Sequence, residues 1–573
     1  YMVPSFVVKL DKIPLNVNGK VDKRALPEVN MSSLRAEYLA PSTKEEKLIV
    51  EAFENVFDQK RISLNDDFIR LGGDSLTAIK LVSYLEGYNI TVADILSLRT
   101  PLAIAGIIRQ LSFDLDMYSL EEGCPLTESQ LNIYLDIISN SKTDSFLIPV
   151  SIPIPREYEV EKLVDALEKL FAAHPILEMK VSEEFDTPYL VKGRKPSISI
   201  ESDVDEKYGR EFVTKPFDLQ DSLSRFLIVE NDEMYNLFAV FHHLIFDGLS
   251  ASVLEHDLFE ILNGKTIDVD DSFLIVSAFD SQISEKDEFD EASLFYESML
   301  ADIDEAGVLL ESIDADGPGN YSIDLEADIT DLLDKYEASE NVFFTSVFAY
   351  TLSRFMGDDK VSFNIVENGR DRFNNFNSIG MFVNTLPLLV ECKDQQISSF
   401  IDYMSDIIYG VMGYNYYPFR LLASKYDITS DILFQFKPDW FTKGDVTFIE
   451  NTFDKNIREG IIEDMNDFIT DLEVDVVQKG SEYSLNIIYS DKYSRKFIEH
   501  IGESFKLILH DFVNADKLSD INYTTQTDLE ILDSYNETEY AFKYSDILDA
   551  FNDNLVEFEH KTLVGYKNRS YTH

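Results

Sequence analysis

Two short stretches of the chain bring together residue types that can do chemistry. A Gly-Gly-Asp-Ser run places Ser75 at a helix start, where the helix dipole would favour an attached phosphodiester. Further along, His242 and His243 precede Asp247 and Gly248 on a strand-to-helix turn, and they offer imidazoles for proton transfer beside a carboxylate. The first stretch predicts an attachment point for a prosthetic arm, and the second predicts an acyl-transfer centre that the arm feeds.

Each stretch also has a plain structural interpretation. Serine is a preferred N-cap, so Ser75 alone could simply cap a helix. Adjacent histidines at a strand end point to opposite faces, so only one of His242 and His243 can face a site. The other histidine should pack inward and be fixed by a hydrogen bond. Asp247 can orient the turn or pair with an arginine.

The elements around Ser75 predict a small all-α unit over 38–112. A capping box at Ser42-Thr43-Lys44-Glu45 opens an amphipathic helix. A second helix runs from Ser75 to Leu85, a third lies over 101–110, and a flexible polar connector follows over 113–123. The apolar face of the first helix comprises Leu48, Ile49, Ala52, Phe53, Val56 and Phe57.

From Cys124 onward the pattern changes to mixed helices and strands. An apolar run over 235–242 predicts a buried strand that ends at the histidine pair, and a helix follows over 250–263. This strand and helix would position the histidine turn. Further helices are predicted over 161–173, 341–356 and 397–413, and strands over 360–366, 381–390, 431–437 and 482–489.

The composition narrows the classes of function. The chain has 573 residues, enough for roughly three or four domains, and 45% hydrophobic content supports packed cores. Its 50 Lys+Arg against 105 Asp+Glu give a net charge of -55, which disfavours nucleic-acid and membrane-surface binding. This excess predicts a solubilising acidic surface, with adaptation to a salty cytoplasm as the lesser alternative.

The cysteines and the lengths of the apolar runs indicate the cellular compartment of the protein. Cys124 and Cys392 stand outside any CxxC pattern, so they are predicted to be buried thiols in a reducing cytosol, with no metal site. No apolar run approaches the ~20 residues that span a bilayer, and no signal peptide opens the chain. We therefore expect a cytoplasmic protein.

The stretch Phe68–Leu76 resembles the phosphopantetheine attachment site of peptidyl carrier domains in nonribosomal peptide synthetases. The resemblance makes Ser75 the residue that carries 4′-phosphopantetheine. It also implies a phosphopantetheinyl transferase as a partner.

The stretch His242–Gly248 resembles the HHxxxDG signature of condensation domains, which are related in fold to chloramphenicol acetyltransferase. The resemblance implies that His243 is catalytic within a motif completed by His242, Asp247 and Gly248. It also implies structural support from Arg370, paired with Asp247. Further matching segments are Pro125–Gln130, Asn364–Arg370, Ile379–Pro387 and Tyr417–Phe419.

The implied fold class is multidomain. A small all-α four-helix carrier domain precedes an α/β, chloramphenicol-acetyltransferase-like, pseudodimeric condensation domain with lobes over 124–290 and 291–520. Residues 1–30 resemble the C-terminal tail of an adenylation domain, in which Lys20 has no active site to serve. Residues 521–573 resemble a linker and the start of the next adenylation domain. Both ends look cut from something longer.

The implied reaction is amide formation in nonribosomal peptide synthesis. A carrier-bound acyl or peptidyl thioester would condense with the amine of an aminoacyl thioester on a downstream carrier domain. An upstream adenylation domain would be a further partner. Two alternatives stay open: ester formation with an alcohol acceptor, and a catalytically inactive carrier-docking platform, against which the intact histidine pair speaks.

Some positions depart from the family pattern. Ala172–Glu178 matches the histidine-containing second motif only in part, and Asn132–Tyr134 replaces the usual arginine-tryptophan of the opening motif. The choice between an L- and a D-configured donor therefore stays open. Gly248 and Ala251 fit an epimerisation domain poorly. The aspartates of a heterocyclisation site are absent, because the histidine pair stands there.

Overall fold

The computed structural model describes residues 38–438, 447–448 and 470–572, apart from gaps at 86, 111, 141–145, 186, 203, 231–233, 327–328, 337, 430, 513, 539–540, 542 and 558–560. The predicted adenylation tail over 1–30, with Lys20, lies outside these residues. Contacts divide the described chain into two compact units, with the division after Tyr523.

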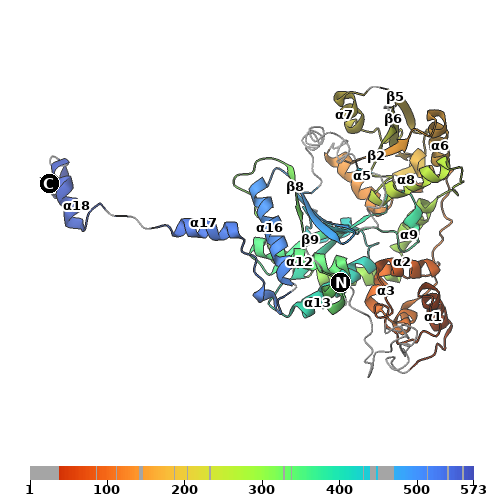
Figure 1. Cartoon of the computed structure of the whole chain (residues 1–573), viewed down its shortest axis with the longest axis horizontal. Coiled ribbons are helices and arrows are strands. Elements are labelled where there is room, and N and C mark those ends of the chain that lie inside the picture. Colours follow the sequence, from red (N-terminus) through yellow and green to blue (C-terminus); the bar gives the residue numbers. More distant parts are fainter. Residues whose placement is uncertain are drawn as a thin grey trace, which may run out of the picture. The chain divides into compact units, whose positions relative to one another are not determined.

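The first unit begins with a helical domain of four helices, α1 (Lys44–Val56), α2 (Ser75–Tyr84), α3 (Val92–Leu98) and α4 (Pro101–Ile107) (Figure 1). Their core contains the predicted apolar face of α1, with Phe53 and Phe68 at its centre. The helix predicted over 101–110 is α4 and ends at Ile107, while α3 was not predicted at all. With α3 included, the domain has the four helices of the implied carrier fold.

The start of α1 lies one residue later than the sequence suggested. Thr43 and Glu46 form the capping box, instead of Ser42 and Glu45. The Ser42 hydroxyl also donates to the Glu46 carboxylate at 2.7 Å. The Thr43 hydroxyl instead accepts from the Glu46 N–H at 3.1 Å, so Thr43, and not Ser42, fixes the register of the cap.

The first lobe is built on a five-stranded sheet of order β12-β2-β7-β6-β5. Leu147 of β2 lies opposite His242, so the histidine pair stands where the central strand β7 ends. Helices α6 (Val160–Ala173) and α8 (Gly248–Leu262) contribute to the core that covers the sheet. The strands are β2 (Leu147–Pro155), β5 (Ser197–Glu201), β6 (Ser224–Glu230), β7 (Met234–His242) and β12 (Thr447–Phe448).

A smaller sheet of order β1-β4-β3 joins this lobe. Its first strand contains Cys124, which is buried, as is Cys392 in the second lobe, in agreement with prediction. The elements are β1 (Cys124–Pro125), β3 (Met179–Ser182), β4 (Tyr189–Lys192), α5 (Glu128–Asn140), α7 (Glu206–Thr214) and α9 (Ser272–Ile283).

The second lobe has a six-stranded mixed sheet of order β10-β9-β11-β13-β14-β8, in which β11 runs parallel to β9 and β13. Helices α12 (Glu340–Met356), α13 (Ile397–Gly413) and α16 (Arg495–Phe512) pack on it (Figure 1). The strands are β8 (Gly319–Asp324), β9 (Lys360–Glu367), β10 (Asn384–Glu391), β11 (Ile432–Lys437), β13 (Leu472–Lys479) and β14 (Glu482–Tyr489), and the shorter helices are α11 (Thr330–Tyr336) and α14 (Phe419–Tyr426).

One strand and one helix connect the lobes. The strand β12 comes from the later part of the chain but pairs with β2 in the first lobe. Helix α10 (Asp287–Met299) runs across residue 290, the expected boundary, and its Tyr296 is fully buried in the core of the second lobe. The first-lobe sheet therefore includes chain from both sides of the expected boundary.

The connector over 113–123 lies along α9, although the sequence suggested a flexible segment. The Phe113 ring lies 4.7 Å from the ring of Phe279. The Asp114 N–H donates to Gln282 Oε1 at 3.0 Å, and Gln282 Nε2 donates back to the Asp114 carbonyl at 2.8 Å. These contacts hold the start of the connector against the first lobe.

The helical domain contacts the second lobe. Helix α3 packs against α13, and Tyr409 of α13 lies against the core of the helical domain. The Val92 N–H donates to Asp371 Oδ2 at 2.9 Å, and the Ser83 hydroxyl donates to Asn374 Oδ1 at 2.7 Å. Asp371 and Asn374 lie one and four positions after Arg370, so this contact uses the segment after β9.

The second unit contains α17 (Gln526–Asn536), α18 (Ile547–Glu557), β15 (Thr562–Tyr566) and β16 (Arg569–Thr572). Its two strands pair as an antiparallel hairpin. Among the helices that the structure describes in either unit, none is both long and apolar enough to cross a bilayer.

Candidate functional site

His242, the last residue of β7, packs inward as expected. Its side chain has 0% exposure, and its Nδ1 accepts a hydrogen bond from the Leu244 N–H at 3.1 Å. The rings of Phe146 and Phe217 lie 6.4 and 6.2 Å from the imidazole. Burial, aided by the neighbouring His243, lowers the pKa of His242 to about 3, so this histidine is neutral near pH 7.

His243 lies in the turn that follows β7 and is only partly buried. Its N–H donates to the Phe146 carbonyl at 2.9 Å, which fixes the backbone of the turn. Burial lowers the pKa of His243, while its own carbonyl, the Asp247 charge and the Phe246 carbonyl oppose the shift. Its Nδ1 is buried and makes no hydrogen bond to any residue that the structure describes. A substrate could therefore meet only the remaining, partly exposed part of the ring.

Asp247 caps α8 with a carboxylate that has no solvent exposure. Its Oδ1 accepts from the Ser250 N–H at 3.0 Å and from Arg370 Nη2 at 2.6 Å. Its Oδ2 accepts from the Phe382 N–H at 3.1 Å. Because both oxygens are occupied by donors of the protein, Asp247 is suited to hold the turn and not to exchange protons with a substrate.

Arg370 supplies the partner that was expected for Asp247. Its guanidinium is fully buried, and Nη1 donates to the carbonyls of Asn375 and Ser378 at 2.7 and 2.6 Å. The guanidinium also lies over the Phe382 ring, 4.5 Å from its centre. Arg370 therefore joins the Asp247 turn of the first lobe to the 375–382 segment that follows β9.

Two glycines shape this junction. Gly248 is the first residue of α8 and directly follows the capping Asp247. Gly369 has a φ of +64°, and a Cβ at this position would lie only 1.8 Å from the Phe382 carbonyl oxygen. Only glycine tolerates both the left-handed backbone and the close approach.

Several residues of this junction were not identified from the sequence. Ser250 Oγ lies 2.9 Å from Asp247 Oδ1, and it accepts from the Gly380 N–H at 3.0 Å. Serine three residues after a capping aspartate is an ordinary helix-start spacing, and this signal could have identified it. Gln130, inside a motif that was recognised, donates from Nε2 to the Leu244 carbonyl at 2.7 Å and so supports the histidine turn.

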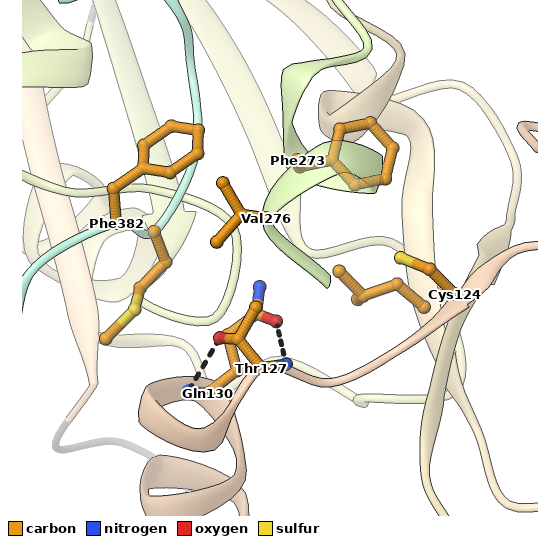
Figure 2. A pocket seen from close by; sticks show the side chains of 8 residues that line it. Cys124, Thr127, Gln130, Phe273, Val276 and Phe382 are labelled. Carbon is orange, nitrogen blue, oxygen red and sulfur yellow. Dashed lines mark hydrogen bonds between the residues drawn. The ribbon is translucent and has the colours of Figure 1, made fainter. Parts of the chain in front are cut away.

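A small pocket lies beside this support (Figure 2). Gln130 and Thr127 exchange hydrogen bonds at its wall, with Thr127 N–H to Gln130 Oε1 at 2.9 Å. Burial raises the pKa of the Cys124 thiol to about 12, so this cysteine is a neutral wall residue. The lining is mostly apolar and consists of Cys124, Thr127, Gln130, Leu190, Phe273, Val276, Met381 and Phe382.

The turn before α2 fits an attachment serine. Asp74 is the N-cap, accepting from the Thr77 N–H at 2.7 Å, and Ser75 is the first helical residue. The interpretation of Ser75 as a simple N-cap is therefore wrong. Gly72 has a φ of +92°, and a Cβ on Gly73 would lie 2.5 Å from the Phe68 ring. The tight turn ends at a helix N-terminus, which suits a phosphodiester.

Solved structures define the fold class. The X-domain from teicoplanin biosynthesis superposes with a TM-score of 0.60 at 14% identity, covering 71% of this chain and 99% of its own. The first condensation domain of the CDA synthetase gives 0.55 at 14% identity, covering 70% and 98%. An epimerization domain from tyrocidine synthetase gives 0.55 at 15% identity, covering 69% and 99%. One fold thus serves several functions.

The sequence comparisons give the family. Residues 121–532 match the family Condensation domain, and residues 47–108 match the Phosphopantetheine attachment site. The chain belongs to the condensation domain family, and a phosphopantetheine-bearing carrier domain precedes the condensation domain. This domain pair is that of nonribosomal peptide synthetases.

Two curated synthetases are similar in sequence to this chain. Gramicidin S synthase 2 of Brevibacillus brevis is 25% identical over 593 residues, covering 94% of this chain and 13% of that protein. Bacitracin synthase 2 of Bacillus licheniformis is 26% identical over 472 residues, covering 75% of this chain and 18% of that protein. The chain therefore spans less than a fifth of the curated relatives it is compared with here.

Proposed function

We propose that this chain joins an acyl or peptidyl thioester to the amine of a downstream aminoacyl thioester, forming an amide in nonribosomal peptide synthesis. The single observation that carries the proposal is the turn at His243, whose neighbours are fixed while its own imidazole stays partly accessible. An upstream adenylation domain and a downstream carrier domain would supply the activated substrates.

His243 accepts the proton in this proposal. The amine nitrogen attacks the thioester carbon, a C–N bond forms, and the C–S bond breaks. His243 Nε2 takes the proton that the nitrogen loses and returns it to the leaving thiolate. The lowered pKa keeps the imidazole neutral near pH 7, so its lone pair is available. An α-amine has a pKa of about 7.7–8.0, so a fraction of the acceptor is already neutral.

Asp247, Gly248, His242 and Arg370 hold His243 in place in this proposal. His242 fixes the turn from inside through the Leu244 N–H. Asp247 fixes it from the α8 side, where Gly248 begins the helix, and Arg370 neutralises the buried carboxylate. Both oxygens of Asp247 accept from donors of the protein, so its carboxylate is not free to meet a substrate.

Ser75 is the proposed attachment residue for 4′-phosphopantetheine, which a phosphopantetheinyl transferase would install. The bound group supplies a flexible arm and the thiol of the donor thioester. The α2 N-terminus after Asp74 would favour the phosphodiester through backbone N–H groups and the helix dipole. Two buried free cysteines and the acidic composition fit work in a reducing cytoplasm.

Condensation in trans tests the proposal. The chain is loaded at Ser75 with a peptidyl donor, an aminoacyl-loaded acceptor carrier is added, and intact-protein mass spectrometry follows the acyl group. We expect transfer in the wild type, none in Ser75→Ala, and a large loss in His243→Ala. Transfer that survives in His243→Ala at the full rate would remove His243 from catalysis, and loaded Ser75 without any transfer would favour the docking platform. A hydroxyacyl acceptor in the same assay separates ester formation from amide formation.

A further inference from the structure

His174, at the end of α6, is a buried histidine that the proposed reaction does not use. Its side chain has 0% exposure. Its Nε2 lies 2.8 Å from Asp257 Oδ2 on α8, and its Nδ1 lies 3.2 Å from Asp270 Oδ2 in the segment before α9. An ionised carboxylate only accepts hydrogen bonds, so two ionised aspartates at these distances require both ring nitrogens to donate, which makes the ring an imidazolium.

The charges around His174 support this state. Burial by itself lowers the pKa of His174, but the hydrogen bonds and charges of Asp257 and Asp270 outweigh it and raise the pKa. Burial opposes ionisation of Asp270, yet the hydrogen bonds from His174 and Ser272 lower its pKa overall. Asp257 and Asp270 are the charged groups that face the ring, one from each element packed against it.

A continuous path of hydrogen bonds leads from His174 to the Asp247 turn. Asp270 Oδ2, the oxygen that faces His174, also accepts from the Ile379 N–H at 3.1 Å. The next residue, Gly380, bonds to Ser250, and the Ser378 carbonyl accepts from Arg370. The 378–380 segment is therefore held by Asp270 on one side and by the Arg370 and Asp247 network on the other.

We propose that His174 is a positioning residue for the condensation site, whose buried imidazolium fixes Asp270 so that the 378–380 segment holds Arg370 against Asp247. Asp257 completes the arrangement by holding the second ring nitrogen from α8, the helix that Asp247 caps. His174 does not touch substrate in this arrangement. Its effect on rate rests on the proposed function, whereas its ionisation does not.

The ionisation is measured first, because it needs no activity. Histidines are labelled with 15N in the full chain, and the His174 signals are identified by their loss in His174→Gln. We expect both ring nitrogens of His174 to be protonated at pH 7 and to remain so above the ordinary histidine pKa of about 6.5. A neutral His174 ring at pH 7 would overturn the proposal, whatever the transfer assay shows.

The effect on catalysis is measured by transfer from Ser75. His174→Gln leaves the buried Asp257 and the partly buried Asp270 without their cation, so His174→Gln/Asp257→Asn serves as a second variant that removes one of the two carboxylates. For His174→Gln we expect kcat to fall roughly 10- to 100-fold with little change in KM for the acceptor carrier, because the catalytic turn is displaced. The double variant should regain stability and part of the rate. The exposed His256→Gln on α8 is the matched control.

The pH profile separates positioning from simple packing. Wild-type kcat should fall as the pH rises through the raised pKa of His174, and this limb should be absent in the double variant. A folded His174→Gln with wild-type kcat, or a double variant with an unchanged alkaline limb, would overturn the proposal. If the wild type transfers nothing, the proposed function fails, and the ring ionisation alone then decides whether His174 is the buried cation that we infer.

Discussion

Arg370 and Asp247 are 123 positions apart in the chain, yet Arg370 Nη2 donates to Asp247 Oδ1 at 2.6 Å with neither side chain exposed to solvent. The pair joins the helix start behind His243 to the segment after β9. Two opposite charges without solvent need further hydrogen bonds to offset the loss of their hydration. Asp247 accepts from three residues, and Arg370 donates to carbonyls as well.

Removal of either partner should destabilise the chain strongly. We expect Asp247→Ala or Arg370→Ala to lower the free energy of unfolding of the condensation domain by about 3–5 kcal/mol, because each leaves an uncompensated buried charge. Urea denaturation measures the loss, and the double variant gives the coupling energy. The more exposed pair of Arg354 and Asp359 is the control, where Arg354→Ala should cost about 1 kcal/mol or less. Equal costs at the two pairs would contradict this account.

His243 should matter for rate and not for stability. We expect His243→Ala to reduce transfer from Ser75 by roughly 10²–10⁴-fold, the usual contribution of a general base. The thermal midpoint should stay near that of the wild type, since the ring is only partly buried. His256→Ala, at an exposed position of α8, should leave both quantities unchanged. A melting temperature that falls in step with the rate would point to a structural role instead.

Gly369 and Gly357 form a matched pair for testing the junction. Both have left-handed backbones, with φ of +64° and +67°, but a Cβ at Gly369 meets the Phe382 carbonyl oxygen at 1.8 Å, while Gly357 has nothing within 4 Å. Gly357→Ala should therefore cost about 1–2 kcal/mol from backbone strain alone. Gly369→Ala should cost clearly more and reduce transfer, because Phe382 also donates to Asp247. Similar unfolding midpoints for the two variants would show that the structure around Gly369 accommodates the alanine methyl group.

The local patterns around the site were readable from the sequence. The strand into His242 is an almost continuous apolar run and the helix after Asp247 is rich in apolar residues, and their bounds differ from prediction by at most two residues. The pairing of Asp247 with Arg370 came from a family resemblance, since no local pattern links positions so far apart. The roles of His243 and Ser75 stay predictions until transfer is measured.

Other features of the fold could not be predicted from the sequence, because tertiary contacts determine them. The strand predicted from 381 begins at Asn384, since the Phe382 N–H is directed to Asp247 and not into the sheet. Helix α3 has only seven residues, too short for a periodic signal, although its capping box at Thr91 and Asp94 was visible. The pairing of β12 with β2 joins segments about 300 positions apart, which no composition or spacing reveals.

Glu367 should make stability fall as the pH rises. Burial, together with the nearby Asp371, raises the pKa of Glu367, while in the unfolded chain its pKa is about 4.3. Between these two values the unfolded chain binds fewer protons, so the stabilisation is full below about pH 4.3 and is lost as the pH rises through the folded pKa. Glu367→Gln cannot ionise and can still accept from the Gly369 N–H, which lies 2.7 Å from Oε2.

The measurement for Glu367 is the urea midpoint at several pH values. Relative to the wild type, Glu367→Gln should gain about 1–3 kcal/mol at pH 8 and little at pH 5. The exposed Glu51→Gln on α1 should show no such pH dependence. A difference between wild type and Glu367→Gln that does not change with pH would mean that the buried acid ionises freely in the folded chain.

The contact between the carrier domain and the second lobe should be detectable by crosslinking. The Ser83 hydroxyl lies 2.7 Å from Asn374 Oδ1, and both native cysteines are buried, so Ser83→Cys/Asn374→Cys places two reactive thiols at one junction. A short thiol-specific crosslinker should join them within the chain, as seen by peptide mass spectrometry.

Glu51→Cys/Asn374→Cys, with its first cysteine on α1, is the matched control and should react far less. Asp371→Ala should slow the first reaction, because Asp371 accepts from the buried Val92 N–H. If both cysteine pairs react equally and Asp371→Ala has no effect, the carrier does not rest on the segment after β9, and the neighbours of Arg370 play no part in its docking.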